Sequence, residues 1–144
     1  VVDLWLSLSA SDGNIFVYLQ DVAPDGKVVK VTDARLKASL RKVSKPKYEN
    51  YGLPYHRSHR EDAQPLKPGE PAQLIFAFLP ASHIFKAGHR IRISVAGSDY
   101  RECDRAPVSP APIVTILNTP SNPSYISLPV INMKNVRDHK KGED

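Results

Sequence analysis

The chain has 144 residues, which is the length of one domain and enough to bury a core without disulfides or structural metals. Its single cysteine excludes an internal disulfide, and 13 prolines spread along the sequence exclude long helices and coiled coils. No apolar run approaches the roughly 18 residues of a transmembrane helix. No signal peptide is visible, which slightly favours a cytoplasmic location.

Positive charge is concentrated in residues 27–60, which hold ten Lys and Arg but only two acidic residues. Tyr48, Tyr51 and Tyr55 lie among these cations. Cations neutralise phosphates and aromatic rings stack on bases, so the stretch has the composition of a nucleic-acid surface. No sequence signature of a nucleic-acid-binding fold accompanies it. We therefore favour a solvated loop, or a loop that docks on another domain.

The first half of the chain predicts three strands. Residues 4–8 alternate leucine with other side chains, and residues 15–19 form a short apolar run. The turn residues 11–14 between them predict a hairpin. A strand restarts at residues 28–32, whereas residues 35–43 fit either a strand or an irregular segment. Residues 44–71 contain five prolines and predict a long surface loop.

The second half predicts further strands at residues 74–79, 90–95, 113–117 and 126–130, followed by a charged tail. The segment 90–95 shows the clearest alternation, because Arg and Ser take turns with Ile and Val. About eight short strands separated by turn residues indicate an all-β protein, either a β-sandwich or a jelly roll. No linker or repeat divides the chain, so residues 1–144 are predicted to form one domain.

The loop histidines are the strongest metal candidates in the sequence. His56 and His59 have H-x-x-H spacing and precede Glu61 and Asp62. A zinc-binding helix would need Glu after the first His, but Arg57 stands there, and a neighbouring cation disfavours a metal. We interpret them as solvated loop histidines and predict neither a metal nor another cofactor.

A second pair of histidines, His83 and His89, is predicted to be structural, because no nucleophile is adjacent to either in the sequence. Arg90 and Arg92 lie on the polar face of the strand that follows. Asp99 is expected to form an ion pair with one of these arginines.

No nucleophile elbow, G-x-S-x-G, occurs in the chain, so we expect no esterase or peptidase activity from these residues alone.

Cys103 lies in a polar loop whose acidic and basic neighbours have opposing effects on thiolate formation. The turn at 86–88 predicts a positive φ at Gly88.

Five segments of the chain, which follow one another in the same order as in the family, resemble the C-terminal domain of the X-Pro dipeptidyl-peptidase and cocaine-esterase family of serine hydrolases. Residues 19–26 are similar to L-x-D-V-x-P-D-G, and residues 79–93 resemble P-x-(A/S)-x-x-F-x-x-G-H-R-(I/L)-R-(I/L). The other three segments are residues 31–38, 67–70 and 123–130. The motif residues that we expect to be structural are Asp21, Asp25, Gly26, Gly88, His89, Arg90, Arg92 and Asp99.

The resemblance implies a non-catalytic jelly roll, related to galactose-binding-like sandwiches, that packs on a catalytic α/β-hydrolase domain and helps to shape its cleft. The catalytic triad would then lie in that preceding domain. The chain has no initial Met and opens in strand-like sequence, in keeping with a piece of a longer polypeptide. The insertion at 44–66 resembles the acylase and amino-acid ester hydrolase branch, while Ala34 and Lys37 depart from the motif and leave the substrate class open.

Two roles therefore compete for the chain. An accessory domain would use Tyr48, Tyr51 and Tyr55 as contacts with the catalytic domain, because tyrosine combines an apolar ring with one polar end. Exposed tyrosines would also permit a homo-oligomer. The alternative is a carbohydrate-binding module, for which Trp5 is the only tryptophan available for stacking. No nucleic-acid or membrane partner is expected.

Overall fold

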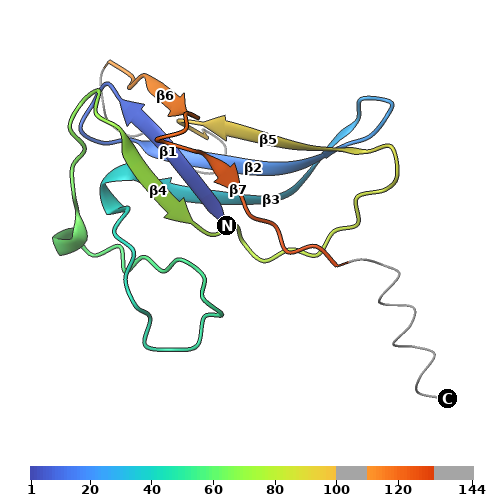
Figure 1. Ribbon diagram of the computed structural model, residues 1–144, viewed down its shortest axis with the longest axis horizontal. Coiled ribbons are helices and arrows are strands. Elements are labelled where there is room, and N and C mark those ends of the chain that lie inside the picture. The colour runs from blue at the N-terminus through green and yellow to red at the C-terminus, as the bar shows by residue number, and fades with distance from the viewer. Residues whose placement is uncertain (100–109, 132–144) are drawn as a thin grey trace.

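The computed structural model describes residues 1–99 and 110–131 of the 144-residue chain. These residues form seven strands and two single-turn 3₁₀ helices (Figure 1). The strands are β1 (Val2–Leu8), β2 (Asn14–Val22), β3 (Val28–Lys37), β4 (Ala72–Phe76), β5 (Arg90–Ala96), β6 (Val114–Leu117) and β7 (Tyr125–Ile126). The helices are η1 (Ala38–Leu40) and η2 (Arg60–Asp62). None of the described helices has the length and hydrophobicity that crossing a membrane requires.

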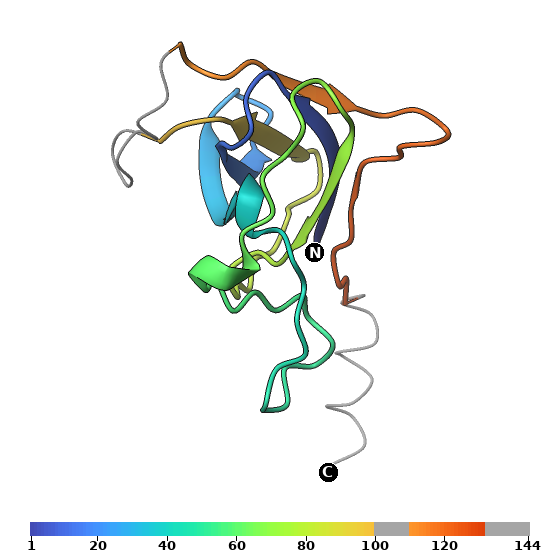
Figure 2. The ribbon, with the colours of Figure 1, turned by 90° about the vertical axis from the view of Figure 1, so that its left-hand side faces the viewer.

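Two antiparallel sheets lie on either side of the core, as the end-on view of Figure 2 shows. One sheet has the order β4–β1–β6, and β7 also pairs with β1. The other sheet has the order β3–β2–β5. The predicted all-β sandwich is therefore confirmed.

The predicted hairpin between the first two strands is wrong, because β1 and β2 belong to different sheets. Both edges of β1 are already occupied, one by β4 and the other by β6 and β7. The carboxylate of Asp12 fixes the crossing between the sheets. Its Oδ1 accepts hydrogen bonds of 2.9 Å from the backbone N–H groups of Gly13 and Ser39. The turn residues therefore guide the chain across the core instead of reversing it within one sheet.

Several strand boundaries also differ from the predicted ones. β3 continues to Lys37 because Ala34 and Leu36 point into the core. β4 ends at Phe76, three residues early, and the chain then turns to β3, where the N–H of Leu79 donates a 3.0 Å hydrogen bond to the carbonyl of Asp33. β7 contains only two residues.

The core lies between the inner faces of the two sheets. Its members are aliphatic or aromatic side chains from β1 to β4 together with Ala38 and Leu66. Burial of each large side chain contributes about 1.5–3 kcal/mol relative to exposure. The buried residues are Val2, Leu4, Leu6, Leu8, Ile15, Val17, Ala34, Leu36, Ala38, Leu66, Leu74 and Phe76. No residue of β5 belongs to this set.

Candidate interdomain site

The carboxylate of Asp21 holds two histidines at the end of the sandwich where β2 turns into β3. Asp21 is buried, and each of its oxygens lies 2.8 Å from a ring nitrogen, namely Nε2 of His83 and Nδ1 of His89. His83 belongs to the connection between β4 and β5, and His89 immediately precedes β5. The carboxylate therefore ties the crossover between the two sheets to the central strand of one of them.

The two histidines also favour the charged form of this carboxylate. The hydrogen bond with His83 lowers the pKa of Asp21, burial opposes this effect, and the hydrogen bond with His89 lowers the pKa further. The ring of His83 packs edge-on against Phe85, with 4.9 Å between the centroids. This geometry supports a structural role for both histidines.

Two turns beside the Asp21 cluster adopt the left-handed backbone conformation that glycine favours. The φ angle is 86° at Gly26 and 81° at Gly88, so the positive φ predicted for Gly88 is confirmed. Asp25 stabilises the first turn, because its Oδ1 accepts a 2.9 Å hydrogen bond from the N–H of Lys27. The motif residues of 19–26 and 79–93 thus meet at one end of the fold.

Asp99 does not make the predicted ion pair with Arg90 or Arg92 in the described residues. It accepts a 2.6 Å hydrogen bond from the hydroxyl of Tyr18. Arg92 instead donates from Nε to the side-chain oxygen of Gln20 at 2.8 Å. The difference arises because Gln20 lies directly opposite Arg92 on the neighbouring strand.

The long loop of residues 44–66, here called the basic loop, is anchored at its base by the buried carboxylate of Asp62, which is 3% exposed. Arg57 donates to both of its oxygens, from Nε at 2.9 Å and from Nη2 at 2.6 Å. Lys42 adds an ion pair of 3.2 Å. The ion pair with Lys42 joins Asp62 to the segment that precedes the loop. The bidentate contact with Arg57 fixes the orientation of the carboxylate.

His56 is a second anchor of the loop, so the prediction that it is a solvated side chain is wrong. Its Nδ1 lies 3.2 Å from the carbonyl oxygen of Lys42, and its Nε2 lies 2.9 Å from that of Ile75 in β4. His59, in contrast, is exposed, with Glu61 3.6 Å away. Within residues 1–99 and 110–131 no cluster of three or more His, Cys, Asp or Glu is placed to hold a metal ion.

Stability is expected to fall between about pH 4 and pH 2 because of Asp62. Its hydrogen bonds with Arg57 lower its pKa from the usual 3.8 to about 2, despite opposing burial. The group therefore stabilises the fold above the unfolded pKa, and this contribution is lost as pH falls through the folded pKa. Melting curves across this range should show a shallower decline for Asp62→Asn than for wild type. Equal slopes would contradict the assignment.

The loop of residues 44–59 extends beyond the two sheets (Figures 1 and 2), and its tip carries exposed tyrosines. Tyr51 is 89% exposed and has a φ of 55°, which is rare for a residue with a side chain. Tyr48 is exposed as well, and its ring meets that of Tyr55 edge-on at 5.7 Å. A 2.8 Å hydrogen bond from the N–H of Ser44 to the carbonyl of Tyr55 closes the loop below them. The tyrosines are thus displayed on a fixed base.

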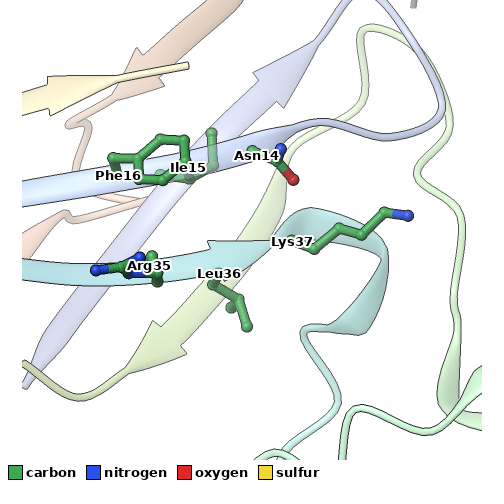
Figure 3. A pocket seen from close by; sticks show the side chains of 6 residues that line it. All are labelled: Asn14, Ile15, Phe16, Arg35, Leu36 and Lys37. Carbon is green, nitrogen blue, oxygen red and sulfur yellow. The ribbon is translucent and has the colours of Figure 1, made fainter. Parts of the chain in front are cut away.

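A small pocket of about 160 Å³ lies beside the start of β2 and the end of β3 (Figure 3). Its lining holds no serine, threonine, cysteine, histidine or carboxylate, and Figure 3 shows Leu36 and Lys37 pointing in different directions. Its composition therefore gives no reason to assign catalysis to it. The lining residues are Asn14, Ile15, Phe16, Arg35, Leu36 and Lys37.

No serine hydroxyl in the described part of the chain is hydrogen-bonded to a histidine. The buried Ser39, for example, donates from its hydroxyl to Asp12 at 2.8 Å. Trp5, on which a carbohydrate site would depend, is only partly exposed. Cys103 lies outside the described residues. The described residues thus offer a structural cluster and an aromatic surface rather than a nucleophile with its base.

Comparison with known proteins gives relatives that are much longer than this chain. Two proteins with the provisional name of serine esterase, from Mycobacterium bovis and Mycobacterium tuberculosis, are each 43% identical over 133 residues. A cocaine esterase from Rhodococcus sp. is 27% identical over 140 residues. The alignments cover 91%, 91% and 89% of this chain but only 21%, 21% and 22% of the relatives. The chain thus spans about a fifth of their length.

A family model matches almost the whole folded region. Residues 1–127 match the model of the X-Pro dipeptidyl-peptidase C-terminal non-catalytic domain. The match includes all seven strands, the Asp21 cluster and the basic loop. The chain therefore belongs to the family of X-Pro dipeptidyl-peptidase C-terminal non-catalytic domains.

Proposed function

We propose that the chain is the accessory C-terminal domain of a serine hydrolase whose catalytic domain has the α/β-hydrolase fold. The observation that carries this proposal is the family match over residues 1–127, together with relatives about five times as long that are named as esterases. The parent enzyme would cleave ester bonds, or the amide bonds of X-Pro peptides or acylated amines. The sandwich would belong to the galactose-binding-like jelly rolls.

The role of the domain in this proposal is to pack on the catalytic domain and to form part of the wall of its substrate cleft. The tip of the basic loop suits such a contact, because exposed tyrosines supply apolar area together with a hydrogen-bonding end. The anchored base limits the entropy lost when the loop docks. The surrounding lysines and arginines favour an acidic partner surface. An isolated solvated loop would gain nothing from this density of aromatic rings.

The proposal is tested in the parent protein by replacing Tyr48, Tyr51 and Tyr55 with Ser. The triple variant should lower kcat/KM for a chromogenic ester several-fold, because loss of interface rings loosens the wall of the cleft. The loop 44–66 should also exchange its amide hydrogens more slowly in the parent than in residues 1–144. A serine-directed inhibitor should stop turnover and leave its adduct outside this chain.

The matched control is Tyr51→Gly in residues 1–144. Stability should change by less than about 1 kcal/mol, because relief of the left-handed backbone offsets the flexibility of glycine. A loss of activity caused by Tyr51→Gly in the parent would then reflect weaker docking of the loop and not a folding defect. Equally fast exchange of the loop in both proteins would refute the docking role. An inhibitor adduct on a serine of this chain would refute the accessory assignment itself.

A further inference from the structure

The strand β5 forms an edge of its sheet in the described structure. It pairs with β2 along its whole length, from Arg90 opposite Val22 to Ala96 opposite Phe16. No described strand pairs with its other side. About half of the residues of this seven-residue strand therefore direct their N–H and C=O groups to that side. Natural edge strands are usually covered, bent or charged at such positions to prevent unwanted pairing.

Three aliphatic side chains of β5 point inward yet remain in contact with water. Val95 lies opposite Val17 and Ile93 lies opposite Leu19, and both partners are buried in the inner layer. Residues opposite each other on neighbouring strands point to the same face of the sheet. Nevertheless Ile91, Ile93 and Val95 are 54%, 37% and 39% exposed.

The opposite side of the sandwich is closed. There the inward residues Ala34 and Leu36 of β3 and Phe76 of β4 are buried, whereas Val29, near the start of β3, is 47% exposed. Two hydrogen bonds also join β3 to the residue Leu79 that follows β4, one of which runs from the hydroxyl of Thr32 to the carbonyl of Leu79 at 2.8 Å. The sandwich is therefore sealed along the second half of β3 and open along the whole length of β5.

The other sheet contributes to the same opening. In both Figures 1 and 2, β5 and β6 lie on the same side of the sandwich. Ile116 of β6 lies opposite the fully buried Leu6 and so points inward, but it is 42% exposed. The two strands come close at one end, where a Cβ added to Gly97 would lie 3.7 Å from Cγ2 of Val114. Inward side chains of both β5 and β6 thus border the opening.

We propose that one extended segment of the parent polypeptide, outside residues 1–144, pairs with the outer edge of β5 and closes this opening. The proposal rests on the proposed function, because it requires a longer parent chain, and the relatives are about five times as long. A strand satisfies the backbone groups of β5 and covers its inward side chains at the same time. A helix laid over the opening would leave those backbone groups without partners.

The charges of β5 indicate the chemistry of the added strand. Arg90 and Arg92 point to the outer face, and neither forms an ion pair with any described residue. Two copies of β5 paired antiparallel over their whole length would place Arg92 opposite Ser94, with the two Arg92 side chains as diagonal neighbours. Arg90 and Arg92 of both copies would then share one face of the pair, and these like charges repel. The segment should therefore come from a different sequence, with apolar residues facing inward and polar or acidic residues facing outward.

Amide hydrogen exchange in the parent protein and in residues 1–144 tests this proposal. Residues 90–96 should exchange at least about tenfold more slowly in the parent. In the parent, Ile93→Lys should return this exchange to the rate of the isolated chain, and Ile93→Thr should act in the same direction without adding charge. Val29→Lys is the matched control, because Val29 is 47% exposed and lies in β3, the strand at the other edge of the same sheet. It should leave the protection of β5 unchanged.

Equal exchange of residues 90–96 in the two proteins would overturn the proposal, even if the parent hydrolyses esters as the proposed function requires. Protection of β5 in a parent without hydrolase activity would uphold the added strand and refute the proposed function. Protection that appears in residues 1–144 only at high protein concentration, together with a dimer in light scattering, would assign the edge to a second copy and overturn the proposal.

Discussion

Replacement of Asp21 by Asn is expected to lower the melting temperature of the chain by about 8 °C at pH 7. The carboxylate accepts hydrogen bonds from two imidazoles at 2.8 Å, whereas a carboxamide of the same shape presents one acceptor and one donor. One histidine therefore loses its partner or must change its tautomer. The loss also removes the negative charge that faces both rings. Differential scanning calorimetry measures the shift directly.

The same substitution should loosen the crossover between β4 and β5, because Asp21 is its tie to β2. Amide exchange of residues 77–89 should accelerate in the variant, while exchange of β1 should change much less. Asp25→Asn is the control, since Asp25 is exposed and accepts a hydrogen bond from the N–H of Lys27. It should shift the melting temperature by less than about 2 °C. Equal effects of the two substitutions would contradict the role given to the cluster.

The strands were predictable where a local pattern decides them. Alternation in residues 4–8 and 90–95 reflects the fact that neighbouring side chains of a strand point to opposite faces, and the strands β1 and β5 include these residues. The choice of partner strand was not predictable in the same way. The turn at 11–14 is compatible with a hairpin, and only the pairing of β1 with β4, β6 and β7 excludes it. Such pairings join residues far apart in the sequence.

The exposure of β5 shows a second limit of sequence patterns. The alternation of residues 90–95 correctly indicates which side chains point inward. It does not say whether anything covers them, because burial depends on neighbours that a local pattern does not contain. Ile91 is more than half exposed although its position is an inward one. The discrepancy between orientation and burial is the observation behind the proposed added strand.

The candidate site was only partly predictable. The family motifs include Asp21 and His89, and a structural role is predicted for His83. The cluster itself could not be predicted, because it joins Asp21 to residues 62 and 68 positions away in the sequence. Asp62 was considered as a metal ligand, whereas it is the buried partner of Arg57. Carboxylate–arginine pairing leaves no spacing signature in a loop. Arg57 and Asp62 are five residues apart, and this separation indicates a contact only once the loop conformation is known.

Gly88→Val is expected to destabilise the chain by about 1–3 kcal/mol. Gly88 has a φ of 81°, a conformation in which a β-branched side chain is strained. Space is not the cause, because an added Cβ would meet its nearest neighbour, Cγ of Pro24, at an ordinary 3.5 Å. The strained turn would also displace His89, the next residue, from Asp21. Denaturant unfolding of the variant and of wild type measures the difference in free energy.

Two controls separate backbone strain from loss of space at Gly88. Gly88→Asn should recover most of the lost stability, because asparagine tolerates the left-handed region better than other residues with a side chain. Gly97→Ala should be nearly neutral, since Gly97 has no left-handed φ and its added Cβ would meet Val114 at 3.7 Å. An unchanged free energy of unfolding for Gly88→Val would show that the turn can adopt another conformation at no cost. Equal losses for the Val and Asn variants would instead assign the effect to the side chain and not to the backbone.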